Sequence, residues 1–293
     1  MTNRILRGFF VLCSLTRATF AVEIGGADSL NEVLQPALIA HLAKVGTEAK
    51  VRLDGTLPAR EGLRDGKIGL ALLFLRDGEL LEKTSDGKAV RRFPLGAAAA
   101  YVYVHPSNRL PEIDLATLAN IFGAGQRSDY KFWSDIPGVN TPEPILTFIS
   151  VPNKHMGQTL FQGIALGGRA FKTSVRTQIS SDLAQESVSS RTNAILVSAT
   201  PLPEKFGRQI KVSDGREGRS TTPYTPDDTN IFNGDYPLRL PIVLCVPESQ
   251  VAPNAEIIKW LLSDEVAGLI RKAGMVPAPS LIRERLVQRL DSK

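Results

Sequence analysis

Histidine and cysteine, two residue types that often take part in catalysis, are few in this sequence and lie far apart. The three histidines, His41, His105 and His155, are widely separated and show no metal-ligand spacing. There are no paired cysteines and no Gly-x-Ser-x-Gly turn for a nucleophilic serine. The acidic pair Asp227-Asp228 lies in a polar stretch and is typical of a solvated turn. These observations predict that the chain is not an enzyme and needs neither a cofactor nor a metal.

The first 21 residues have the pattern of a secretory signal peptide. Arg4 and Arg7 give a basic start, an apolar run covers residues 8–15, and small residues stand where a signal peptidase requires them. The apolar run is too short to span a bilayer. We therefore expect residues 1–21 to be removed and the protein to be exported, to the periplasm or the extracellular space. An amphipathic or buried N-terminal helix is the alternative, because Arg17 lies inside the cleavage region.

Removal of this leader changes both the net charge of the chain and its number of cysteines. The formal net charge is +5, but three of the 35 basic residues and none of the acidic residues lie in the first 21 positions. Without the leader the basic excess falls to two, which removes the argument for a nucleic-acid partner. Cys13 would leave with the leader, so Cys245 cannot form an intrachain disulfide. Its apolar surroundings predict a small buried hydrophobic residue.

The hydrophobic pattern of the first third of the chain alternates between strands and helices. The order β-α-β-α-β predicts a mainly parallel sheet with helices on both faces. The expected elements are a strand from Val22, a helix to about Lys44, a strand at 49–53, a helix from about Pro58 and a strand at 68–74.

Two long apolar strands, one near Tyr101 and one near Ile242, are natural crossings between two lobes. A polar stretch over 211–235 predicts a surface connection. The remaining expected elements are the crossing strand at 93–104, a helix at 115–121, a strand at 145–151, a helix at 155–167, a strand at 194–197, the crossing strand at 236–246, one amphipathic helix at 255–272 and a short solvated helix after Leu281.

Several of these segments form a recognisable pattern. An apolar strand leads into His105-Pro-Ser-Asn108, then a helix that ends in Ile121-Phe-Gly, and then Trp133-Ser-Asp135. More than a hundred residues later come Trp260-Leu-Leu-Ser-Asp-Glu265 and Ala273-Gly-Met-Val-Pro277. This order resembles the substrate-binding proteins of phosphate ABC transporters, over nearly all of the mature chain.

The resemblance implies an α/β fold of the type II periplasmic binding-protein class. Such a protein has two lobes with mixed, mainly parallel sheets flanked by helices, and two crossings between the lobes. The implied division is lobe I at 22–100 and 240–293, and lobe II at 101–239. The implied function is that of a monomeric solute-binding protein that closes over phosphate or another small anion or polar ligand and serves a membrane permease. Helix N-termini at the cleft would favour an anion.

The resemblance also implies where the ligand binds: at a turn after the first strand, at an acid after the third strand and at a turn that opens a helix of the second lobe. The implied ligand-binding residues are Ala27, Asp28, Ser29, Gly55, Thr56, Lys154, His155, Gly157, Gln158 and Thr159. Asp28 departs from the family pattern because it brings a carboxylate to the first loop, where it is expected to cap a helix.

Two further departures weaken the implied phosphate site. Gly69 stands at the third strand where we match the acid that accepts the proton of phosphate in the family. Pro152 stands for the arginine that clamps the anion. Lys154 and His155 would restore part of the positive charge, although a lysine lacks the guanidinium fork. A site with weakened or altered selectivity is therefore expected.

These departures leave a second function open. A binding-protein fold that no longer transports would serve as a sensor, an adhesion module or an assembly module, with a degenerate ligand site. Intact lobes are expected in both cases, so the sequence does not decide between them.

Overall fold

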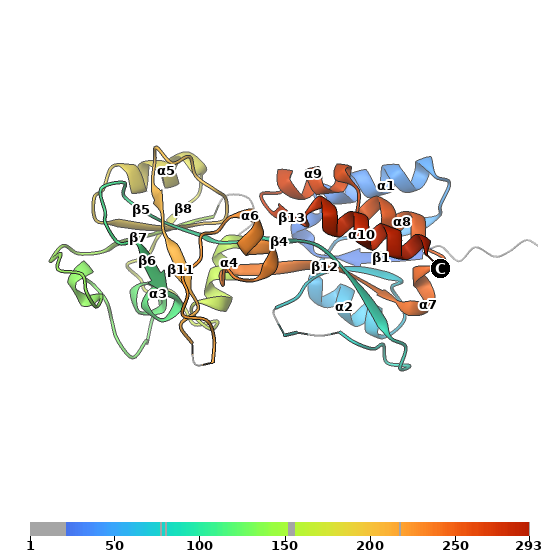
Figure 1. Ribbon diagram of the computed structural model, residues 1–293, viewed down its shortest axis with the longest axis horizontal. Coiled ribbons are helices and arrows are strands. Elements are labelled where there is room, and N and C mark those ends of the chain that lie inside the picture. The colour runs from blue at the N-terminus through green and yellow to red at the C-terminus, as the bar shows by residue number, and fades with distance from the viewer. Residues whose placement is uncertain (1–21, 77, 80, 152–155, 217, 293) are drawn as a thin grey trace, which may run out of the picture.

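The computed structural model shows two lobes joined by two long strands (Figure 1). It describes residues 22–76, 78–79, 81–151, 156–216 and 218–292. The predicted signal peptide lies outside the described residues. Within them, no helix is both long enough and apolar enough to cross a membrane.

Lobe I is built on a six-stranded sheet with the order β13-β4-β12-β3-β1-β2. The first three strands of the chain pair in parallel, as the β-α-β-α-β pattern predicts, and the crossing strands add antiparallel pairs. The strands are β1 (Val22–Gly26), β2 (Ala49–Arg52), β3 (Leu70–Phe74), β4 (Val90–Ala99), β12 (Arg239–Pro247) and β13 (Val276–Pro277). All five residues of β3 are buried, because the sheet is covered on both faces.

Helices cover the lobe I sheet on its two sides, and α2 lies opposite the group formed by α1, α8, α9 and α10 (Figure 1). Their bounds are η1 (Asp28–Leu30), α1 (Leu34–Lys44), α2 (Thr56–Arg64), α7 (Glu248–Val251), α8 (Ala255–Leu261), α9 (Asp264–Lys272) and α10 (Ser280–Asp291). Leu34, Leu38 and Leu42 of α1 are buried at helical spacing, so this face of the helix packs on the core.

Lobe II holds a five-stranded sheet with the order β10-β5-β9-β7-β8 and a two-stranded sheet of β11 and β6. The strands are β5 (Tyr101–Val104), β6 (Glu112–Asp114), β7 (Leu146–Ser150), β8 (Arg176–Gln178), β9 (Ala194–Ser198), β10 (Arg208–Gln209) and β11 (Lys211–Ser213). The helices are α3 (Leu115–Phe122), η2 (Trp133–Asp135), α4 (Met156–Ile164), α5 (Ser181–Ser189) and α6 (Asp228–Asn233). The side chain of Asp114 caps α3 by accepting from the Thr117 amide at 2.6 Å.

The two crossings are tied together where they leave lobe I. The expected strand at 93–104 begins earlier and is interrupted at Ala100, whose amide donates to the Leu238 carbonyl at 2.9 Å. The hydroxyl of the fully buried Tyr236 donates to the Ala100 carbonyl at 2.8 Å. Burial raises the pKa of Tyr236 well above its usual value. The lobe boundaries predicted from the sequence stay a prediction.

The stretch at 211–235 is more ordered than a surface connection. Its first residues form β11, which pairs in parallel with β6, and its later residues form α6. Val212 and Ile231 are fully buried, and Asp227 caps α6 by accepting from the Asn230 amide at 2.9 Å. Asp227 and Asp228 are exposed as predicted, but the expectation of a mere connection missed β11 and α6, because single apolar residues anchor an otherwise polar stretch.

The single helix expected at 255–272 is two helices, α8 and α9. Ser263 caps α9 by accepting from the Val266 amide, and the Leu262 carbonyl accepts from Arg283 at 2.9 Å. The final helix, α10, is therefore not merely solvated, because Arg283 is buried and also donates to the Ala278 carbonyl at 3.0 Å.

Candidate functional site

A cavity of about 200 Å³ lies between the two lobes. Residues of both lobes line it, from the loop after β1, the end of α9 and the start of β13 on one side, and from the starts of α4 and α5 and the end of β9 on the other. Its lining is Asp28, Ser29, Glu32, Val33, Ala98, Ala99, Met156, Ser181, Ala199, Thr200, Lys272, Ala273, Gly274 and Met275. We take this interlobe cavity as the candidate binding site, because it contains residues that the sequence predicts for the ligand.

Ser29 is the predicted residue with the most direct signal for a ligand. Its Oγ is buried and has no hydrogen-bond partner among the residues that the structure describes. A buried hydroxyl without a partner costs free energy, so such a group calls for an explanation. A polar group of a ligand in the cavity would supply the missing bond.

The neighbours of Ser29 in the first loop differ in what they offer. Asp28 lines the cavity, but it does not cap α1, because the short helix η1 intervenes and its carboxylate accepts from the Ser29 amide at 3.0 Å. The expectation of a helix cap at Asp28 was therefore wrong. Ala27 is buried, and its amide donates to the Leu72 carbonyl at 2.9 Å. The Ala27 amide is therefore committed to the sheet.

Gly55 and Thr56 lie at the same edge of the sheet but do not line the interlobe cavity. The Gly55 amide donates to the Gly26 carbonyl at 2.9 Å, and a φ of 149° there suits glycine. The Thr56 hydroxyl accepts from the Phe74 amide at 3.3 Å. Both predicted residues therefore hold the loops beside the cavity in place.

The third predicted loop is described only from Met156 onward, so Lys154 and His155 lie outside the described residues. Met156, the first residue of α4, lines the cavity. The positive end of the α4 dipole therefore meets the cavity. Gly157 is buried, Gln158 is half-buried and Thr159 is exposed, and none of these three lines the cavity.

Gly157 has a packing role that the sequence did not reveal. A Cβ at this position would lie 2.4 Å from the Ala199 Cβ and 2.7 Å from the Ala199 Cα. Only glycine therefore allows α4 to approach the end of β9 this closely. Met156 and Ala199, which flank this contact, both line the cavity.

Several lining residues were missed by reasoning from sequence. Ser181 opens α5, Thr200 follows β9, and Lys272 ends α9. The expected strand at 194–197 could have pointed to Thr200, because residues after parallel strands often line a ligand site. Gly274, with φ of 77°, would place a Cβ 3.1 Å from the Thr200 Cγ2, so the lobes approach closely here.

The charges around the cavity are mixed. Asp28 and Glu32 bring carboxylates, while Lys272 brings an ammonium group. Together with the α4 N-terminus, this arrangement can bind a small polar ligand that offers both acceptors and donors. Among the described residues, it does not present the several cationic side chains of a dedicated polyanion site.

Comparison with known proteins finds one similar sequence group and several structures of the same fold. The phosphate-binding protein PstS of Pseudomonas aeruginosa is 24% identical over 256 residues, which are 82% of this chain and 77% of that protein. A possible phosphate binding protein from Planctomyces limnophilus superposes with a TM-score of 0.72, at 20% identity, over 93% of this chain and 98% of its own. The chain resembles phosphate-binding proteins.

Other solved structures agree on the fold. PstS from Borrelia burgdorferi superposes with a TM-score of 0.66 at 14% identity, covering 88% of this chain and 98% of its own. An ABC-type phosphate transport receptor from Vibrio cholerae gives 0.62 at 16% identity, covering 88% and 100%. No protein-family model matches the chain. The predicted two-lobed α/β fold and the predicted resemblance are both confirmed.

The structure does not support our match of Gly69 to the acid of the phosphate-binding proteins. Gly69, which we matched to their acid, lies at the amino end of β3, where its amide donates to the Glu23 carbonyl at 2.8 Å. Because β1 and β3 are parallel, this end lies about 16 Å from the carboxyl ends that meet the cavity. Gly69 therefore says nothing about ligand selectivity.

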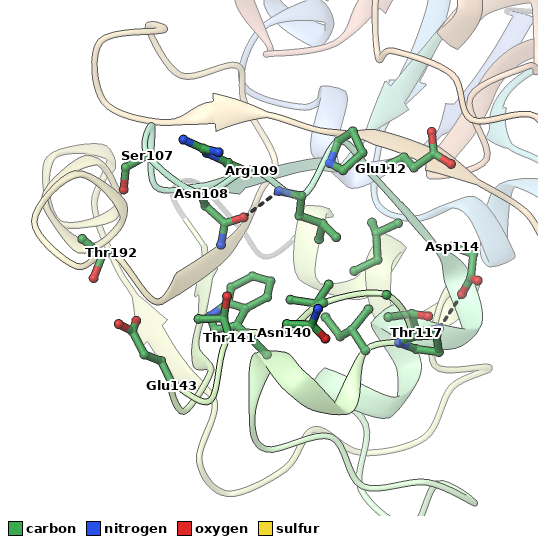
Figure 2. A pocket seen from close by; sticks show the side chains of 18 of the residues that line it. Ser107, Asn108, Arg109, Glu112, Asp114, Thr117, Asn140, Thr141, Glu143 and Thr192 are labelled. Carbon is green, nitrogen blue, oxygen red and sulfur yellow. Dashed lines mark hydrogen bonds between the residues drawn. The ribbon is translucent and has the colours of Figure 1, made fainter.

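A larger cavity, of about 740 Å³, lies in lobe II and contains none of the predicted site residues. Figure 2 shows that the Asn108 side chain turns to its own loop and the Asp114 side chain to the start of α3. The Asn108 Oδ1 accepts from the Leu110 amide at 2.9 Å. Three carboxylates and one arginine line this space, so its charge disfavours an anion. The charged residues are Arg109, Glu112, Asp114 and Glu143.

Proposed function

We propose that this chain is an exported solute-binding protein that holds phosphate, or another small anion or polar ligand, between its two lobes. The observation that carries the proposal is the buried Ser29 hydroxyl, which has no partner among the described residues and belongs to an interlobe cavity. A cavity lined by both lobes can close over a ligand and change shape when it does so.

The similar proteins support the nature of the ligand and the setting. The Pseudomonas aeruginosa protein is named as the phosphate-binding protein PstS, and the Borrelia burgdorferi structure also carries the name PstS. The Vibrio cholerae structure is named as an ABC-type phosphate transport receptor. By this likeness we propose a membrane permease of an ABC transporter as the partner, a periplasmic or extracellular location and a monomeric state. Binding without catalysis and without a nucleic-acid partner belongs to the same proposal.

The second function, a module that no longer transports, is favoured by one observation. The Asp28 carboxylate lines the interlobe cavity, where it would repel a phosphate group. Binding of phosphate therefore requires compensation from Lys272 and the α4 N-terminus. If Lys272 and the α4 N-terminus do not offset the repulsion from Asp28, the cavity binds no anionic ligand.

Replacing Ser29 by alanine distinguishes ligand binding from a structural role. If the Ser29 hydroxyl bonds to a charged ligand, its loss costs about 1.5–3 kcal/mol, or about ten-fold to a hundred-fold in Kd. The melting temperature without ligand is expected to stay unchanged or rise slightly, because Ser29→Ala removes an unpartnered buried hydroxyl. Calorimetry and thermal unfolding with phosphate, sulfate, phosphonates and small carboxylates measure both quantities.

The control is Ser187→Ala, which removes a buried serine hydroxyl from α5 outside the cavity. This variant should bind as the wild type does. Failure of every anion in the panel to stabilise the wild-type protein, combined with self-association or capture of a protein partner, would favour the module without transport.

A further inference from the structure

A second cavity, of about 300 Å³, lies at the opposite end of α4 from the interlobe cavity. It also takes residues from both lobes. Arg76 follows β3 of lobe I and Arg239 begins the crossing strand β12, while Gly163 and Ile164 end α4 and the remaining residues follow β11 or α6. Its lining is Arg76, Gly163, Ile164, Asp214, Arg216, Arg219, Ser220, Thr222, Tyr224, Gly234, Asp235, Pro237 and Arg239. Figure 1 shows α4 and α6 next to the point where β4 and β12 leave lobe I.

The lining of this second cavity is strongly basic. It contains four arginines and two aspartates, which gives these residues a formal excess of two positive charges. A concave surface lined by one sign of charge concentrates ligands of the other sign. The α4 C-terminus at Gly163 and Ile164 carries the negative end of the helix dipole, which accounts for part of this basic character but not for four arginines.

Two of the four arginines, Arg216 and Arg239, form hydrogen bonds within the protein. Arg216 forms a two-pronged pair with Asp214, in which Nη2 donates to Oδ2 at 2.7 Å and Nε donates to Oδ1. This hydrogen bond lowers the pKa of Asp214, and the nearby charge of Arg219 acts in the same direction. Arg239 Nη1 donates to the carbonyls of Ile231 and Phe232 at 3.0 and 2.7 Å, at the end of α6.

Arg76 and Arg219 are different, because neither guanidinium donates a hydrogen bond to a residue in the described ranges. Both side chains are exposed. Nη2 of Arg76 lies 3.1 Å from where a Cβ on Gly163 would stand, so the absence of a side chain there makes room for the guanidinium. Arg219 enters from the loop after β11. Two guanidinium groups that donate no hydrogen bond to a described residue therefore line one cavity from the two lobes, although the charge of Arg76 also acts on the nearby Glu79.

We propose that this second cavity binds a small organic anion with at least two negative charges, held between Arg76 of lobe I and Arg219 of lobe II. Guanidinium groups match carboxylates and phosphates in two-pronged geometry. The volume lies at the lower end of the range for small-molecule sites, so it suits a small polycarboxylate or a phosphate ester. The hydroxyls of Ser220 and Thr222 add polar groups to the wall. The bound anion links the lobes at a point remote from Ser29.

Calorimetry with citrate and with glycerol 3-phosphate, in a low-salt buffer without inorganic phosphate, tests this site. We expect at least one of the two to bind at one site per chain, and acetate to bind more than tenfold more weakly because it carries one charge. Arg76→Gln and Arg219→Gln should each weaken binding about tenfold or more. Which of the two ligands binds more tightly identifies the anionic group that the site prefers.

Three controls keep the result specific. Arg127→Gln removes an exposed arginine outside both cavities and should bind as the wild type does. Ser29→Ala should also leave this binding unchanged, since Ser29 lies in the interlobe cavity. Thermal unfolding checks that the variants are folded. Arg219→Gln is expected to be folded, so it still tests the site if Arg76→Gln fails to fold. The proposal is overturned if neither anion binds, if both arginine variants bind like the wild type, or if Ser29→Ala abolishes the binding.

Discussion

Gly157→Ala is expected to lower the free energy of unfolding by about 3 kcal/mol, the upper end of the usual range for an overpacked core. The added Cβ would lie 2.4 Å from the Ala199 Cβ, and the next nearest atom is the Ala199 Cα at 2.7 Å. Backbone cannot move aside as a flexible side chain can, so α4 or the end of β9 must shift. Ligand affinity should fall too, because Met156 and Ala199 line the interlobe cavity.

A matched control comes from another helical glycine. Gly268 lies in α9, and a Cβ there would meet no atom within 4 Å. Gly268→Ala should therefore stabilise the protein by about 0.5–1 kcal/mol through helix propensity alone. Chemical denaturation of both variants measures the two effects. Equal stability of the two alanine variants would show that α4 does not pack on β9 as described.

Arg283→Met is expected to cost about 3 kcal/mol of stability. The Arg283 side chain is buried and donates to the carbonyls of Leu262 and Ala278 at 2.9 and 3.0 Å. Methionine fills a similar volume but donates nothing, so two carbonyls lose their partner. The bond of Arg283 to Asp264, at 2.6 Å, adds little because the Asp264 side chain is 91% exposed.

The neighbouring Arg285→Met is the control, because Arg285 is exposed on the same helix and its replacement should change stability by less than about 0.5 kcal/mol. Thermal or chemical unfolding separates the two variants. Similar unfolding midpoints for both would contradict the role of Arg283 as the residue that fastens α10 to the junction of α8 and α9.

The parts of the fold that sequence reasoning predicted well are those with a strong hydrophobic period. The parallel pairing of β1, β2 and β3 followed from apolar strands that alternate with helices. The interruption between α8 and α9 was missed: Ser263, which caps α9, was a local signal for it, but the Leu262 carbonyl beside it is satisfied by Arg283, about twenty residues later in the chain. A local sequence pattern cannot reveal that a backbone carbonyl accepts a hydrogen bond from a residue so far along the chain.

The stretch at 211–235 shows the same limit. Its composition is polar, and only isolated residues such as Val212 and Ile231 enter the core. Isolated apolar residues give no period of 2 or 3.6, so neither β11 nor α6 could be read from them.

The candidate site was predicted in part. Asp28 and Ser29 were found through the family resemblance, which places a ligand loop after the first strand, and both line the interlobe cavity. Thr200 and Lys272 come from distant parts of the chain and meet the cavity only through the packing of the two lobes. Their contribution depends on tertiary structure, which explains why spacing along the sequence did not reveal them.

The distance between the lobes, measured with and without phosphate, tests the central claim most directly. Spin labels at Asp182→Cys in α5 and Glu284→Cys in α10 would report it, since both positions are exposed and lie in different lobes. Cys245 should not take a label, because it is fully buried and burial raises the pKa of its thiol to about 12. Saturating phosphate is predicted to shift the distance distribution to shorter values, and Ser29→Ala to require more phosphate for the same shift. A distribution that saturating phosphate leaves unchanged would contradict the claim that the lobes close over this ligand.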